Sequence, residues 1–182
     1  MNNILILIIS IAILLVIFLV ILTIISKNKI NEVLETINVA NDDINNCLKQ
    51  KYAVYKEIIK YIKDNLSIKE DAFENFNNFK RGECTKSEII NMLDKTTFEI
   101  NDYVDSYDEL LKQKDFMDLK RKLYNVQINL ESVIEYYNKK LIIYDDLKSH
   151  GPTSIASKLF DFDEFKEISI DKKEISRLIN LN

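Results

Sequence analysis

The chain contains few of the residues that interrupt helices. Its 182 residues include two glycines and one proline, and a helix ends most readily at residues of these types. This scarcity predicts long helices whose ends are set mainly by capping side chains. It also argues against a nucleotide site, because two glycines can hardly form the glycine-rich loop that surrounds phosphate groups.

The sequence is equally poor in residues that carry out chemistry. Its two cysteines, Cys47 and Cys84, are too few for a disulfide framework and fit a reducing compartment. The single histidine, His150, precedes Gly151-Pro152, where a helix-end role is expected. No nucleophile with its base, metal cluster or tuned carboxylate pair can be recognised. We therefore expect a protein that is not an enzyme and uses no cofactor or metal.

Basic charge is also scarce. The formal net charge is -4 and the isoelectric point is about 5.2, so the surface has no cationic excess suited to a phosphate backbone. The adjacent carboxylates Asp42-Asp43 and Asp145-Asp146 diverge around a helix and predict a solvated face. No nucleic acid partner is expected.

What the sequence does contain is one long apolar run near its start. Residues 4–25 include no charged residue, and Ser10 and Thr23 are the polar interruptions. A helix of this length measures roughly 33 Å, which covers the roughly 30 Å hydrocarbon core of a bilayer. A cleavable signal peptide would need a basic region before a shorter apolar stretch, and only Met1-Asn2-Asn3 precedes this one. Residues 1–26 are predicted to be a retained transmembrane anchor that contacts the lipid bilayer through residues 4–25.

The distribution of lysines predicts the orientation of the span. No cation precedes it, whereas Lys27 and Lys29 follow it directly. Positive residues favour the cytoplasmic side. We expect a single-pass protein of the cell membrane, with its N-terminus outside and its C-terminal domain in the cytoplasm.

Four helices are predicted after the span. Apolar residues recur at three- and four-residue spacing over 27–65, and the absence of a breaker after residue 26 predicts one continuous helix from the span onward. Capping boxes at Ser67 to Glu70 and Thr85 to Glu88 predict helices over 67–81 and 86–112. The first of these two carries Phe73, Phe76 and Phe79 on one face and ends at Gly82.

The last helix is predicted over 115–149, ending at Gly151-Pro152, and the apolar tail 152–182 is expected to dock on the domain. The fold class is therefore all-α: a transmembrane helix continuing into an antiparallel up-and-down four-helix bundle over residues 27–182. One alternative is a three-helix bundle in which the two short middle helices form a single kinked rod.

The order of several residues resembles the LemA family, bacterial proteins with an N-terminal transmembrane helix and a cytoplasmic helical bundle. In the first helix, the family pattern is matched at Ala40, Ile44, Leu48, Lys51, Ile58, Ile59, Ile62 and Lys63. In the last helix and tail it is matched by Tyr137-Asn138, Leu141, Tyr144-Asp145, Pro152, Ser154-Ile155-Ala156, Phe160, Phe162 and Phe165. The chain departs from the family at Lys56, Gln127 and Ile134, where proline, glutamate and arginine are common. The family has suggested links to membrane organisation and membrane proteases, so the resemblance implies partners at the membrane.

The candidate site is the family motif at the end of the last helix. The Tyr137-Asn138 and Tyr144-Asp145 pairs are seven residues apart and return to nearly the same helix face. We expect them to pack within the domain, and ligand binding is the alternative. The other motif residues are Leu141, Pro152, Ile155 and Ala156.

The predicted function is that of a non-enzymatic membrane-anchored scaffold or adaptor that acts through unidentified membrane-associated proteins. The alternative is a membrane-bound sensor that binds a small ligand between its helices. Self-association into a homo-oligomer is left open by the remaining apolar positions.

Overall fold

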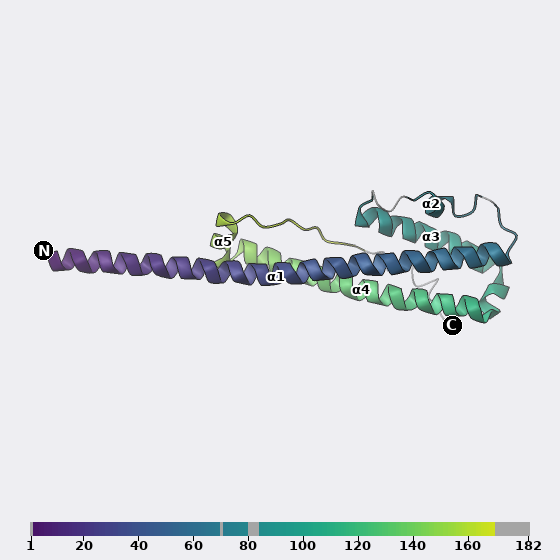
Figure 1. Ribbon diagram of the computed structural model, residues 1–182, viewed down its shortest axis with the longest axis horizontal. Helices are drawn as coiled ribbons and strands as arrows, with labels where there is room; N and C mark the ends of the chain where they lie inside the picture. The colour runs from purple at the N-terminus through teal and green to yellow at the C-terminus, as the bar shows by residue number, and fades with distance from the viewer. Residues whose placement is uncertain (1, 70, 80–83, 170–182) are drawn as a thin grey trace. The chain divides into compact units, whose positions relative to one another are not determined.

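The computed structural model describes residues 2–69, 71–79 and 84–169, and all regular structure in these residues is helical (Figure 1). The elements are α1 Asn2–Asn65, α2 Glu74–Asn77, α3 Lys86–Ser106, the 3-10 helix η2 Asp108–Lys112, α4 Lys114–Ser149 and α5 Thr153–Leu159. They form two compact units. The first contains residues 1–40 and 136–167, and the second is built on residues 41–135.

Helix α1 confirms the prediction of one continuous element, because its 64 residues run without a break through the apolar segment and beyond it. The side chains of residues 3–21 are all exposed, whereas Ile30, Ile37 and Ala40 are buried. The hydroxyls of Ser10 and Thr23 donate to carbonyls four residues earlier, at 2.9 and 2.8 Å. The polar groups of the apolar segment are therefore satisfied within the helix, as a hydrocarbon environment requires.

In the described part of the chain, α1 is the one helix long and apolar enough to cross a membrane, with a mean hydropathy of 3.7 over its most apolar window.

The first unit is formed by α1 up to Ala40, the end of α4 and α5. Its core contains Ile30, Ile37, Ala40, Tyr137, Leu141, Tyr144 and Ala156. These apolar residues come from α1, α4 and α5. Apolar residues therefore recur every three or four positions in this part of both α1 and α4.

In the second unit, three helical segments surround a shared core. Residues of α3 and α1 pair in the same order along both helices, so the two helices run parallel; the pairs are Lys86 with Asn41, Asp94 with Lys51, and Thr97 with Tyr55. Residues of α4 pair with α1 in the reverse order, through Phe116 with Tyr61 and Lys122 with Glu57. Helices α1 and α4 are therefore antiparallel.

The predicted helix over 67–81 is wrong, because α2 contains four residues. Phe73 has φ of 63° and ψ of 28°, a left-handed conformation through which a right-handed helix cannot continue. The conformation buries two aromatic rings: Phe73 lies 5.3 Å from the Tyr103 ring, and Phe76 stacks on Tyr52 at 4.6 Å. Aromatic packing thus outweighs local helix propensity. The predicted cap at Glu70 and the predicted end at Gly82 lie outside the described residues.

Both predicted bundles need correction at this segment. The described residues contain three long helices, α1, α3 and α4, instead of four. A single kinked rod made of the second and third helices would place α3 antiparallel to α1, whereas the two helices are parallel. Among the described residues between α1 and α3, which are 66–69, 71–79 and 84–85, the one α-helix is the four-residue α2.

Helix α3 begins as predicted and ends earlier than predicted. Thr85 and Glu88 form the reciprocal capping box, with the Thr85 amide donating to Glu88 at 2.7 Å. The predicted end at residue 112 is wrong, because α3 stops at Ser106 and η2 follows. In this tighter 3-10 turn, Leu110 faces inward and is 1% exposed, whereas the next residue, Leu111, is 38% exposed.

Candidate functional site

The two motif tyrosines of α4 hold the chain that follows α5. The Tyr144 hydroxyl donates to the carbonyl oxygen of Asp163 at 2.8 Å, and the Tyr137 hydroxyl donates to that of Lys166 at 3.1 Å. The Tyr144 ring also meets Phe165 edge to face, with ring centroids 5.8 Å apart. The seven-residue spacing places both hydroxyls along one face, where they contact two carbonyls of the segment 160–167 that are three residues apart.

The ionisation of these tyrosines suits hydrogen-bond donation. Burial raises the pKa of Tyr144 to about 12, and the carboxylates of Asp163 and Asp145 act in the same direction. Burial also raises the pKa of Tyr137. Both phenols therefore keep their protons at neutral pH and can donate to backbone carbonyls.

The other predicted motif residues divide between the core and the surface. Leu141 and Ala156 are buried beside the tyrosines, and Asn138 is half-buried. Asp145, Pro152 and Ile155 are exposed. The structure thus brings Tyr137, Leu141, Tyr144 and Ala156 together and leaves the exposed three outside that group.

The turn between α4 and α5 has the predicted form. Gly151 has φ of +65°, the left-handed conformation that ends a helix. His150 occupies the helix end, with its Nδ1 atom 3.1 Å from the Asp146 carboxylate. The hydroxyl of Ser157 lies 2.8 Å from the carbonyl oxygen of Lys148 and 2.9 Å from that of Ser154, which places α5 against the end of α4.

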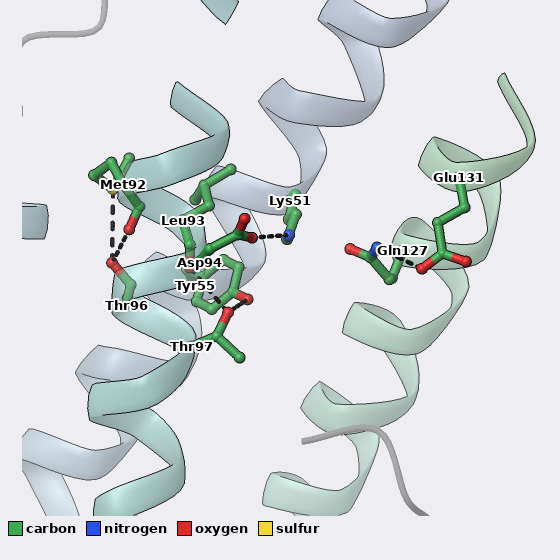
Figure 2. A network of polar contacts seen from close by, with 9 residues as sticks. All are labelled: Lys51, Tyr55, Met92, Leu93, Asp94, Thr96, Thr97, Gln127 and Glu131. Carbon is green, nitrogen blue, oxygen red and sulfur yellow. Dashed lines mark hydrogen bonds and ion pairs between the residues drawn. The ribbon is translucent and has the colours of Figure 1, made fainter. Parts of the chain in front are cut away.

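A second group of polar side chains lies inside the unit of residues 41–135. We call it the buried polar cluster; it comprises Lys51 and Tyr55 of α1, Asp94 and Thr97 of α3, and Gln127 and Glu131 of α4 (Figure 2). The three helices that form the core each contribute two members. The cluster was not predicted from the sequence, in which Lys51 is identified only as a position of the family pattern.

Lys51 is the charged member that burial affects most. Its side chain is 3% exposed, and its ammonium lies 3.7 Å from the Asp94 carboxylate. Burial lowers the pKa of Lys51, while the negative charges of Asp94 and Glu131 oppose that change. The lysine is therefore a desolvated group whose charged form is favoured by the nearby Asp94 carboxylate and, to a smaller extent, by Glu131.

Tyr55 and Thr97 link α1 to α3 beside the lysine. Their hydroxyl oxygens are 2.5 Å apart, and Thr97 also lies 2.9 Å from the Leu93 carbonyl oxygen. The Thr97 hydroxyl has one proton, and the Leu93 carbonyl can only accept a hydrogen bond. Thr97 therefore donates to Leu93, and Tyr55 donates to Thr97. Burial raises the pKa of Tyr55, so this donor is permanent at neutral pH.

Gln127 completes the cluster on the α4 side. Its amide nitrogen donates to Glu131 at 2.8 Å, while its buried carbonyl oxygen has no hydrogen-bond partner among the described residues. Figure 2 shows this oxygen directed toward Lys51. The cluster thus presents a buried ammonium group and a buried acceptor to each other.

A comparison with family models gives a match to the LemA family over residues 40–180. The chain belongs to the LemA family. This finding confirms the resemblance predicted from the sequence. No curated protein and no solved structure gives a match. The matched residues include both the α4 motif and the buried polar cluster, and they begin after the apolar segment.

The burial of Lys51 and Gln127 could have been predicted from their positions in the sequence. Lys51 lies three residues after Leu48 and four before Tyr55, and both of these are core residues. Gln127 lies four residues after Leu123 and three before Leu130. Polar residues at positions of an apolar stripe are expected to face the core. In this LemA family member, the apolar stripes of α1 and α4 face each other where Lys51 and Gln127 lie.

Proposed function

We propose that this LemA family protein is a non-enzymatic scaffold anchored in the membrane by a single pass of residues 4–25. The observation that carries the proposal is the change of burial along α1. Residues 3–21 expose every side chain, and the same helix becomes part of an apolar core from Ile30 onward. Exposed isoleucine and leucine over five turns of helix would be unfavourable in water and are favourable in lipid.

The proposed orientation places the N-terminus outside and the domain in the cytoplasm. Lys27 and Lys29 directly after the span support it, because cationic residues near a span favour the cytoplasmic side. The reducing cytoplasm also suits the small number of cysteines, Cys47 and Cys84.

The proposed scaffold acts by holding its helical domain near membrane-associated proteins. An anchor raises the effective concentration of a domain for partners in the same membrane. The continuity of α1 supports an anchor that passes into the helical domain without an intervening linker. Exposed apolar residues such as Ile128 and Ile142 offer contact area for such a protein, or for a second copy in a homo-oligomer.

Crosslinking in intact cells, followed by identification of the captured proteins, tests the scaffold. The matched control lacks residues 2–25 and keeps the domain. We expect the full chain to capture membrane proteins that the control does not capture. Capture at background level by the full chain in repeated experiments would contradict the scaffold.

A second candidate function is that of a sensor for a small polar ligand. The buried polar cluster supports it, because the Lys51 ammonium faces the Gln127 carbonyl oxygen, which has no hydrogen-bond partner among the described residues. Screening small polar metabolites by thermal shift tests this function, with Lys51→Met as the control. A ligand that stabilises the wild type and not the variant is expected, and equal shifts in both proteins would oppose a site at Lys51.

A further inference from the structure

We propose that α5 lies on the membrane surface and inserts Ile155 and Leu159 among the lipid headgroups, next to the point where α1 leaves the bilayer. This inference rests on the proposed anchor and adds a second contact with the same leaflet. The partner is the surface of a phospholipid bilayer.

The two sides of α5 differ in what they contact. Thr153 and Ala156 are buried against the unit formed by residues 1–40 and 136–167. Ile155 is 49% exposed and Leu159 is 66% exposed. Residues four apart share one face of a helix, so these two side chains form an apolar face that points away from the protein.

A contact at the C-terminal end of α5 determines where this face lies along the axis of α1. The Lys27 ammonium lies 4.2 Å from the centre of the Phe160 ring. Phe160 directly follows Leu159, and Figure 1 shows α5 beside α1. The contact between the Ser157 hydroxyl and the Lys148 carbonyl holds α5 in this place.

The depth follows from helix geometry. Lys27 is two residues beyond Ile25, the last residue of the apolar segment, which corresponds to roughly 3 Å along the axis. The headgroup layer on each side of a bilayer is about 5 to 8 Å thick. When residues 4–25 span the hydrocarbon core, Leu159 therefore lies within the headgroup layer, where exposed leucine is favoured.

The charges beside the apolar face suit a phospholipid surface. Lys29 and Lys158 are exposed, and Lys27 is half-buried against Phe160. Lysine side chains at such a boundary can extend their ammonium groups toward lipid phosphates. Asp161 is exposed next to this face, so the apolar pair provides most of the contact and the lysines add to it.

Site-directed fluorescence on the full chain in vesicles of phosphatidylcholine and phosphatidylglycerol tests the inference. Cys47 and Cys84 are replaced by serine, and single cysteines carrying an environment-sensitive dye are introduced by Leu159→Cys, Val39→Cys and Ile17→Cys. Val39 is the matched control, because it is 57% exposed in the same unit and lies 12 residues beyond Lys27. Ile17 reports on the span itself. Quenching by spin-labelled lipids is measured at each site.

We expect lipid quenching at positions 17 and 159 and none at 39, with emission at 159 shifted to shorter wavelength. Quenching at 17 with none at 159 would overturn the surface contact while leaving the anchor intact. A wavelength shift at 159 without lipid quenching would assign the face to a second copy and also overturn it. Absence of quenching at 17 would contradict the anchor, and with it the inference.

Discussion

The ammonium of Lys51 lies 3.7 Å from the carboxylate of Asp94, and both side chains are largely removed from water. This pair joins α1 to α3 in the core of residues 41–135, where the parallel arrangement of the two helices brings them to the same level. Burial determines both the free-energy cost of removing the two charges from water and the strength of their attraction to each other. Desolvation disfavours each charge, and each charge is tolerated because the other is near.

Removing one member of this pair is therefore expected to destabilise the protein more than removing both. Asp94→Ala leaves a buried cation without its nearest partner and should cost about 3 to 5 kcal/mol of unfolding free energy. Lys51→Met combined with Asp94→Ala should recover much of that loss. Urea denaturation of the single and double variants in detergent measures the coupling. A double variant that loses the full sum of the two single losses would show that the pair is not coupled.

Tyr144→Phe tests the contact between α4 and the segment 160–167. Loss of the hydrogen bond to Asp163 should cost about 0.5 to 1.5 kcal/mol at neutral pH. The control is Tyr136→Phe, because Tyr136 is exposed on the same helix, and it should leave stability nearly unchanged. Equal stability of the two variants in thermal denaturation would contradict a role for the Tyr144 hydroxyl.

The same tyrosine predicts a dependence of stability on alkaline pH. Its pKa rises from 10.0 to about 12 on folding, so the folded chain holds its proton more tightly than the unfolded chain. The resulting stabilisation is present below pH 10 and is lost as the pH rises toward 12. The wild type should therefore lose its advantage over Tyr144→Phe across this window. An advantage that stays constant there would oppose the raised pKa.

Gly151→Ala should destabilise the protein through its backbone alone. The residue has φ of +65°, and a Cβ atom added there would meet nothing within 4 Å. The expected cost is about 1 to 2 kcal/mol, the penalty of the left-handed conformation for an alanine. Gly151→Asn should cost less, because asparagine adopts this conformation more readily. Thermal denaturation compares them, and equal losses would argue against conformational strain as the cause.

Phe76→Ala and Phe79→Ala distinguish the observed segment from the helix predicted there. Phe76 is buried and stacks on Tyr52, whereas Phe79 is half-buried. We expect a loss of about 3 to 5 kcal/mol for Phe76→Ala and a smaller loss for Phe79→Ala. A regular helix with the three phenylalanines on one face would make the losses similar, so similar losses would contradict the irregular conformation.

The parts of the fold that depend on local pattern could be predicted from the sequence. The uninterrupted α1, the Thr85 to Glu88 capping box and the end of α4 at Gly151 follow from helix breakers and capping groups, and the structure confirms them. The chain around α2 could not be predicted in the same way. Phe73 packs on the Tyr103 ring of α3, and Phe76 packs on the Tyr52 ring of α1; both partners are distant in sequence.

The motif tyrosines of α4 depend on local spacing and could be predicted from the sequence, whereas the buried polar cluster depends on how distant helices pack. The spacing of Tyr137 and Tyr144 predicts that they share a face, and hydrogen bonds to Lys166 and Asp163 occur on that face. Recognising the buried polar cluster required knowing that stripes of three helices meet at one level. Lys51 was visible at a stripe position, but its partner Asp94 comes from a helix whose direction the sequence did not specify.

The membrane anchor is the central claim, and one measurement tests it most directly. Cells expressing the full chain with a C-terminal tag are converted to spheroplasts, treated with external protease, and their membranes are then extracted at alkaline pH. We expect the tagged chain to stay intact in spheroplasts, to be digested after lysis, and to remain in the membrane after extraction, whereas a chain lacking residues 2–25 should be released. Release of the full chain by alkaline extraction would contradict the anchor, and digestion of the tag in intact spheroplasts would contradict the orientation.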